Sequence, residues 1–148
     1  LREYPQAFPS SAEQEAARPL EWARRRLAAD AARPHDFFLG ACDGDRLCGV
    51  VGLEGRYRPK ERHNASLVGM VVAPECAGQG TGRVLVEALV RRARMFPALT
   101  QIDLTVTAGN DRARRLYEAC GFRLVGVLPR AIRVDGRYHD KLQMQLQL

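Results

Sequence analysis

The sequence has no long apolar run, and this absence excludes a membrane-spanning helix. None of its segments approaches the roughly 18 consecutive apolar residues that such a helix needs. The first residues also lack a charged start followed by an apolar core and a small-residue cleavage site. With 148 residues, 46% of them hydrophobic, we expect one soluble domain over residues 1–148, in the cytoplasm and without a membrane partner.

Lysine and aromatic residues are scarce although the chain is basic. The net charge is +6, yet Lys60 and Lys141 are the only lysines among 23 basic residues, and aromatic residues make up 7%. Arginines are scattered over every segment, and no aromatic side chains are interleaved with them as stacking platforms for single strands. The composition therefore argues against a nucleic-acid partner, and a basic nucleic-acid-binding module stays only as a minor hypothesis.

Cysteine is also sparse, and its spacing excludes the common metal sites. The four cysteines show no paired spacing of the kind that binds zinc, and they lie in or beside apolar segments: Cys42, Cys48, Cys76 and Cys120. We therefore expect no metal and buried thiols in a reducing compartment. Cys76 flanks a glycine-rich stretch, where it could be exposed.

That glycine-rich stretch organises the chain. An apolar run over Leu67–Val72 precedes Gly78, Gly80 and Gly82, and apolar residues then recur at helical spacing. The pattern predicts a strand, a loop and a helix. Because glycines leave successive backbone N–H groups free to turn toward one anion at a helix N-terminus, the loop is suited to a phosphate.

Two familiar phosphate-binding loops do not match this spacing. A dinucleotide-binding loop needs two residues between its second and third glycines, whereas one residue separates Gly80 from Gly82. A nucleoside-triphosphate loop needs lysine followed by serine or threonine, and Arg83-Val84 occupies those positions. The phosphate therefore belongs to another class of ligand.

A second block, Asn110–Phe122, narrows that class. Asn110 is a good helix N-cap, Gly121 is a natural stop after the helix, and one helical face carries Ala113, Leu116, Tyr117 and Cys120. Together the two blocks resemble the acetyl-CoA loop and the later motif of the GCN5-related N-acetyltransferase (GNAT) family, in the right order and about 30 residues apart. Gly80 and Gly82 fit the loop signature. Ala77 departs from it, because the family has arginine or glutamine there.

The resemblance covers roughly Phe37–Leu148 and implies the fold. It is an α/β domain with a mixed, mostly antiparallel central sheet flanked by helices on both faces. The family's first strand is expected to be missing from this chain or replaced. The patterns place strands at 37–42, 46–54, 65–73, 101–107 and 142–148, the last after a turn at 134–137, and helices at 20–30, 82–95 and after Asn110. Trp22, in the first of these helices, is expected to be a packing anchor.

The resemblance also implies acetyl-CoA as cosubstrate and places its binding site. Main-chain groups of Val71, Val72 and Ala73 should pair with the pantetheine arm as an added strand does. Asn110 should contact the coenzyme or order its loop, and Arg83, Arg112 or Arg115 could meet the phosphates. The expected cradle around the pyrophosphate comprises Ala77, Gly78, Gln79, Gly80, Thr81, Gly82 and Arg83.

Acetyl transfer to a primary amine by direct attack sets the expected catalytic roles. The amine must lose a proton and the departing thiolate must gain one. The resemblance places Tyr117 near the sulfur as general acid, and His63 or Glu54 is the candidate base. The acceptor, a small molecule or a protein amine, is not readable from the sequence, and a homodimer stays open. The alternative is a non-catalytic acyl-CoA-binding sensor, motivated by Ala77 and by the lack of an unambiguous base.

Overall fold

A computed structural model describes residues 7–8, 10–28 and 30–148 of the chain. Its elements, in chain order, are α1 (Ala12–Ala16), α2 (Leu20–Leu27), β1 (Phe37–Asp43), β2 (Arg46–Gly55), β3 (Asn64–Val72), the 3₁₀ turn η2 (Pro74–Cys76), α3 (Thr81–Ala93), β4 (Gln101–Thr107), α4 (Asp111–Ala119), β5 (Arg123–Val134) and β6 (Arg137–Gln147).

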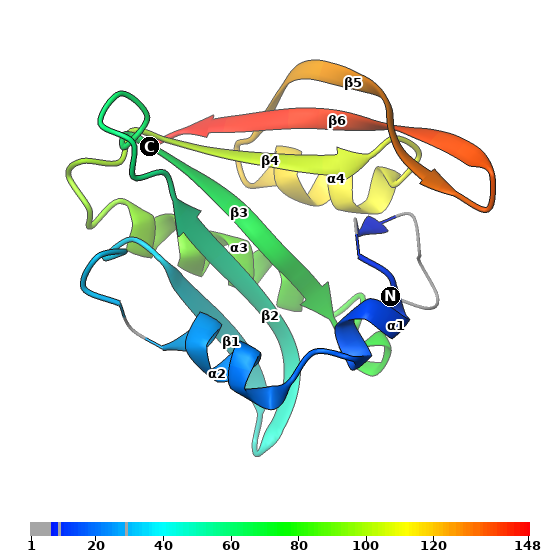
Figure 1. Cartoon of the computed structure of the whole chain (residues 1–148), viewed down its shortest axis with the longest axis horizontal. Coiled ribbons are helices and arrows are strands. Elements are labelled where there is room, and N and C mark those ends of the chain that lie inside the picture. The colour runs from blue at the N-terminus through cyan, green and yellow to red at the C-terminus, as the bar shows by residue number, and fades with distance from the viewer. Residues whose placement is uncertain (1–6, 9, 29) are drawn as a thin grey trace.

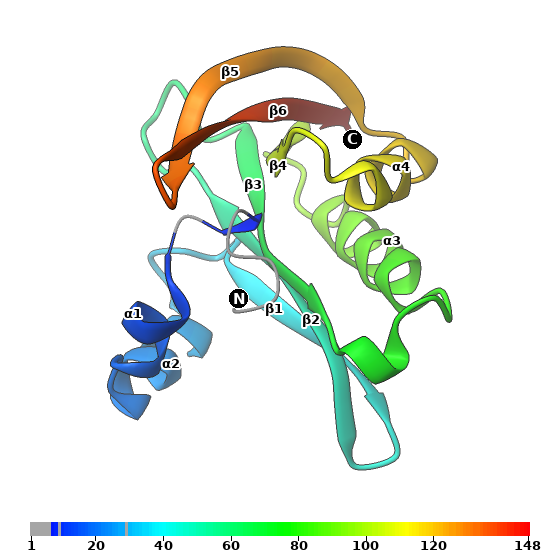
Figure 2. The same ribbon diagram turned by 90° about the vertical axis from the view of Figure 1, so that its right-hand side faces the viewer.

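The strands form one mixed sheet. In the described part of the chain its order is β1-β2-β3-β4-β6-β5, with β3 and β4 parallel and every other neighbouring pair antiparallel. Helices α3 and α4 lie on one side of the sheet and α1 and α2 on the other (Figure 2). The expected fold class is thus confirmed. No strand precedes β1 among the described residues, and a strand before Leu1 would lie outside them.

The two central strands meet at one end only. Register pairs join Asn64–Ser66 of β3 to Gln101–Asp103 of β4, and beyond them the strands diverge (Figure 1). The joined end is held by Asp103, which accepts hydrogen bonds from Arg56 at 3.2 Å and Gln145 at 3.0 Å. The divergence leaves the second half of β3 without a partner on its β4 side.

A bulge marks the point where β3 leaves β4. The register between β2 and β3 shifts between Val50 and Gly52, opposite Gly69, which has a φ of +60°. Such a left-handed backbone is readily adopted only by glycine, and a bulge of this kind bends the strand that carries it. Gly69 therefore helps to open the gap between the two central strands.

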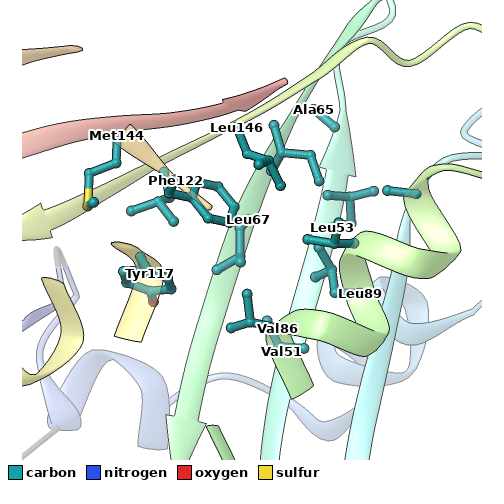
Figure 3. Close-up of a cluster of buried hydrophobic side chains, with 14 of the residues drawn as sticks. Val51, Leu53, Ala65, Leu67, Val86, Leu89, Tyr117, Phe122, Met144 and Leu146 are labelled. Carbon is teal, nitrogen blue, oxygen red and sulfur yellow. The ribbon is translucent and has the colours of Figure 1, made fainter. Parts of the chain in front are cut away.

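The core lies between the sheet and the helices α3 and α4. Leu53 and Val51 of β2 pack with Leu89 and Val86 of α3, and all four side chains are fully buried (Figure 3). On the β4–β6 side the cluster continues through Met144, Leu146, Phe122 and Tyr117. Burying side chains of this size stabilises the fold by about 1.5–3 kcal/mol each, so the core fixes α3 and α4 against the two halves of the sheet.

Helix α1 begins at a serine cap, and two of the predicted helices end earlier than expected. Ser11 accepts a hydrogen bond from the Gln14 backbone and caps α1, as expected of a serine at this position. The helix expected to reach Asp30 ends at Leu27, because Asp30 instead bonds the Ala32 N–H and the Arg33 guanidinium in a turn. Helix α3 ends at Ala93 rather than Met95.

The expectation of free, buried thiols was wrong for three of the four cysteines. Cys48 of β2 and Cys76 of η2 form a disulfide across 28 positions of sequence. Cys76 is 2% exposed rather than open to solvent, whereas Cys42 is free and exposed. The sequence offered no spacing rule for this pair, because only the return of β3 along β2 brings Cys76 back to Cys48.

Candidate coenzyme and acceptor cleft

A cleft of about 1010 Å³ runs through the opening between the diverging strands. One end is lined by Val71 of β3, by Asn110 at the N-cap of α4 and by Tyr117 in α4. The other end, on the opposite side of the sheet, is lined by Arg18 and by Trp22 of α2. A ligand in this cleft would therefore reach both faces of the sheet.

The glycine loop stands at the start of α3. Gly78 and Gly80 have φ values of +82° and +85°, and a Cβ at either would meet no atom within 4 Å. Glycine is therefore required by backbone conformation, and the space over the loop is open. Gly80 is the N-cap and supplies no capping side chain, so the first-turn N–H groups of α3 remain available to an anion.

Neighbouring residues fix the loop without covering those donors. The Thr81 hydroxyl donates to the carbonyl of Cys76 at 3.2 Å, and the Gln79 amide donates to the carbonyl of Glu75 at 3.2 Å. A Cβ at Gly82 would lie 3.2 Å from Leu116 of α4 and from Met70 of β3, so glycine here permits close packing of α3. Ala77 is half-buried, and its methyl group offers no hydrogen bond to a ligand.

The end of β3 leads directly from the opening into this loop. Ala73 N–H donates to the Cys48 carbonyl on the β2 side at 2.8 Å. Val71 is 44% exposed and lines the cleft, and Val72 is half-buried against the core. The side of this segment that faces β4 has no strand partner, which leaves an edge where an extended chain can add.

Helix α4 carries Asn110 at its N-cap and Tyr117 within it, and both line the cleft wall that faces β3. Asn110 accepts a hydrogen bond from the Ala113 N–H at 3.1 Å and so starts the helix. Tyr117 lines the cleft but is 7% exposed, and burial, followed by the nearby Cys120, raises the pKa of its hydroxyl to about 12. Tyr117 is therefore protonated at every physiological pH.

The three candidate phosphate-binding arginines lie outside the cleft lining. Arg83, in the first turn of α3, is exposed and pairs with Glu87 at 2.7 Å. Arg112 and Arg115 are exposed on α4, and no hydrogen bond or ion pair joins either to another described residue. All three side chains are free to turn toward a bound ligand at the cost of, at most, one surface ion pair.

The two candidate bases are placed differently. His63 is exposed in the loop before β3, and its carbonyl accepts from the Thr100 N–H at the joined end of the central strands. It does not line the cleft. Glu54 of β2 accepts a hydrogen bond from Arg26 at 2.5 Å, and Arg26 does line the cleft. The structure thus brings Glu54, but not His63, next to the cleft wall.

Sequence reasoning missed the wall formed by α1, α2 and β6. Trp22 was predicted to be a packing anchor; it packs against Arg18, whose guanidinium lies 3.9 Å from its ring centroid, but it is 37% exposed and lines the cleft. Arg26 and Lys141 line the same wall. The scarcity of lysine could have drawn attention to Lys141, but no local pattern shows which strand face carries it.

Comparison with known proteins decides the family. The model of the acetyltransferase (GNAT) family matches residues 1–122. The chain belongs to the GNAT family. It is 34% identical over 117 residues to the N-alpha-acetyltransferase RimI of Mycobacterium tuberculosis, across 78% of this chain and 70% of that protein. It is 32% identical over 97 residues to the spermidine N(1)-acetyltransferase of Vibrio cholerae, across 66% of this chain and 56% of that protein.

A solved structure agrees on the fold. The acetyltransferase yncA of Salmonella typhimurium, determined with its cofactor acetyl-CoA, superposes with a TM-score of 0.75 at 22% identity, covering 96% of this chain and 79% of that one. The expectation of a member of an acetyl-CoA-dependent N-acetyltransferase family is confirmed. The relatives' names specify different acceptors, so kinship does not identify the acceptor of this chain.

Two further expectations concern the surroundings of the protein. Among the described residues, no helix is both long enough and apolar enough to cross a membrane, and no three histidine, cysteine or acidic side chains gather in a group that could hold a metal ion. Cytoplasmic location and the absence of a metal stay predictions. The single domain and the homodimer stay predictions as well.

Proposed function

We propose that this protein transfers the acetyl group of acetyl-CoA to a primary amine by direct attack. The observation that carries the proposal is the unpaired edge of β3: it lines the cleft opposite Tyr117, and the chain continues from it into the glycine loop at the start of α3. Residues from three elements thus form a path that fits a long chain with a phosphate at one end.

The chain's own groups suggest the binding mode. The N–H groups at the start of α3 would hold the pyrophosphate, with the help of the helix dipole. Main-chain groups of Val71, Val72 and Ala73 would pair with the pantetheine arm. A free N–H of this edge would donate to the thioester carbonyl oxygen as charge develops on it. Acetyl-CoA supplies the activated acetyl group.

The remaining chemistry is movement of protons. The amine nitrogen attacks the carbonyl carbon, the carbon–sulfur bond breaks, one proton leaves nitrogen and one ends on sulfur. Tyr117, kept protonated by burial, is suited to donate toward the departing sulfur. For the base we favour Glu54 over His63, because the ion-pair partner of Glu54 lines the cleft. Replacing Glu54 by glutamine should then lower kcat and leave the Kd for acetyl-CoA little changed.

Two measurements test this function. Calorimetric titration with acetyl-CoA should show saturable one-to-one binding, and thiol release should depend on an added amine. Binding without release from any amine would favour the sensor function, which the loss of the expected side chain at position 77 motivates. Failure to bind acetyl-CoA at low and high salt would contradict both functions.

A further inference from the structure

The wall of the cleft away from α3 and α4 carries an excess of positive charge. The described residues that line the cleft include three cations, Arg18, Arg26 and Lys141, and one carboxylate, Glu15. An amine acceptor approaches this wall as a cation unless it also carries negative charge. The charges of the wall therefore bear on which amines can bind.

The two arginines of the wall already have partners. Arg18 pairs with Glu15 at 3.0 Å, and Arg26 pairs with Glu54 at 2.5 Å. Their guanidinium groups also lie 3.9 Å and 5.3 Å from the ring centroid of Trp22. Because carboxylates and an aromatic ring satisfy them, the arginines shape this wall more than they attract a further anion.

Lys141 differs from both arginines. It is half-buried, and no ion pair or hydrogen bond joins its side chain to another described residue. Burial alone lowers the pKa of its ammonium group, as expected where water is partly removed and no carboxylate replaces it. A half-buried ammonium without a counterion is costly, and an anionic group of a ligand would offset that cost.

The register of β6 places Lys141 on the face of the sheet opposite α3 and α4. Leu142, Met144 and Leu146 point into the core beside α3 and α4. Since side chains alternate along a strand, Lys141 points to the other face, where α1 and α2 lie (Figure 2). The glycine loop belongs to α3 on the opposite side. Lys141 is therefore positioned to meet the acceptor rather than the pyrophosphate.

We propose that the acceptor is a small amine that also carries a carboxylate or a similar anionic group, as an α-amino acid does, and that Lys141 binds this group. The inference rests on the proposed acetyl transfer and narrows its substrate class. It disfavours polyamines, which would bring further positive charge to a wall where Lys141 already has no counterion among the described residues.

The test compares α-amino acids with their carboxamides, which lack the negative charge, and with spermidine, a polyamine. Thiol release from acetyl-CoA is measured with the twenty standard α-amino acids, with the carboxamides of those that react, and with spermidine. We expect reaction with at least one amino acid, and a kcat/KM about tenfold or more above that of its carboxamide and of spermidine, as for loss of one partner of a desolvated charge pair.

Variants then assign the preference to Lys141. Lys141→Gln should raise KM for the amino acid about tenfold, with little change for the carboxamide, and Lys141→Arg should restore part of the preference. The KM for acetyl-CoA should stay unchanged. Lys60→Gln is the matched control, because Lys60 is the other lysine of the chain and lies exposed outside the cleft.

Each outcome is decisive. Coenzyme binding without thiol release from any amino acid, equal use of acid and carboxamide, or preference for spermidine would overturn the inference. An equal loss for acid and carboxamide in Lys141→Gln would also overturn it, since Lys141 would then act on the reaction and not on the anion. Absence of acetyl-CoA binding would instead refute the proposed function on which it rests.

Discussion

The ring of Tyr117 packs edge-on against the ring of Phe122, with centroids 5.9 Å apart and planes at 65°. The contact ties α4 to the first residues after it and fixes the phenol in the cleft wall. Phenylalanine at position 117 would keep this packing and remove only the hydroxyl. Tyr117→Phe therefore tests the role of the hydroxyl group without disturbing the packing of the ring.

We expect Tyr117→Phe to lower kcat by about 10²-fold or more, because positioned proton donors contribute on that scale. The Kd for acetyl-CoA should stay within about twofold, since the coenzyme's main contacts lie elsewhere in the proposed binding mode. Steady-state kinetics and calorimetry on the same preparation provide the two values. Unchanged turnover would remove Tyr117 from the mechanism.

Gly80 and Gly136 have the same backbone conformation and can be compared as a site variant and its control. Their φ values are +85° and +80°, and a Cβ at either meets nothing within 4 Å, but Gly80 caps α3 whereas Gly136 belongs to the β5–β6 turn. Valine at either position should destabilise the fold by about 1–3 kcal/mol through backbone strain. Only Gly80→Val should weaken acetyl-CoA binding, by about tenfold or more, in calorimetric titration. Similar losses in both variants would mean that the loop has no special role.

Ala77 offers a gain-of-binding experiment. An arginine there would restore the side chain that the family signature has at this position, and it could form a charge-assisted hydrogen bond with the pyrophosphate. We expect Ala77→Arg to tighten acetyl-CoA binding by about 1 kcal/mol, roughly fivefold, with the gain shrinking at high salt. A gain that persists at 1 M salt would have to come from contacts other than charge.

The Cys48–Cys76 disulfide should stabilise the segment that enters the glycine loop. Closing a loop of this length is worth about 3–4 kcal/mol in the chain-entropy account. Alkylation of the denatured protein should modify two cysteines before reduction and four after it. Reductant should lower the unfolding temperature of the wild type and of Cys42→Ser equally, since Cys42 is free. Four reactive thiols in the untreated protein would show that the bond is not formed.

The raised pKa values of Tyr117 and Tyr57 predict that the folded protein loses stability in alkali. Burial raises the pKa of both hydroxyls to about 12, assisted for Tyr57 by its hydrogen bond to Asp36. Because the folded state holds these protons more tightly than the unfolded chain, the stabilisation is complete below pH 10 and is lost between pH 10 and 12. Tyr117 should cost about 1.4 kcal/mol between pH 9 and pH 11. Tyr57 is 38% exposed and should cost less, because solvent screens its interactions.

Urea unfolding at the two pH values tests this linkage. Tyr117→Phe should remove the larger part of the pH-dependent loss that these two residues cause, and Tyr57→Phe the smaller part. A loss of the same size in the wild type and both variants would show that other groups control stability in alkali.

Much of the fold could be predicted because it is encoded locally. Periodic apolar residues place β4 within its observed bounds, and Asn110 and Gly121 bracket α4 because capping depends on neighbours in sequence. The glycine loop was equally readable, since positive φ values favour glycine wherever they occur. Gly80 could therefore be placed in advance in the loop before α3, and Tyr117 on the apolar face of α4.

Only the tertiary structure decided which residues share the cleft. The pairing of Cys48 with Cys76, the exposure of Trp22 and the separation of His63 from the cleft all depend on how strands distant in sequence return beside one another. Lys141 illustrates the limit. The sequence determined that a lysine stands in the last strand. The divergence of β3 from β4 and the register of β6 decided that it faces the cleft without a counterion among the described residues, because burial and charge pairing arise only when separate segments pack.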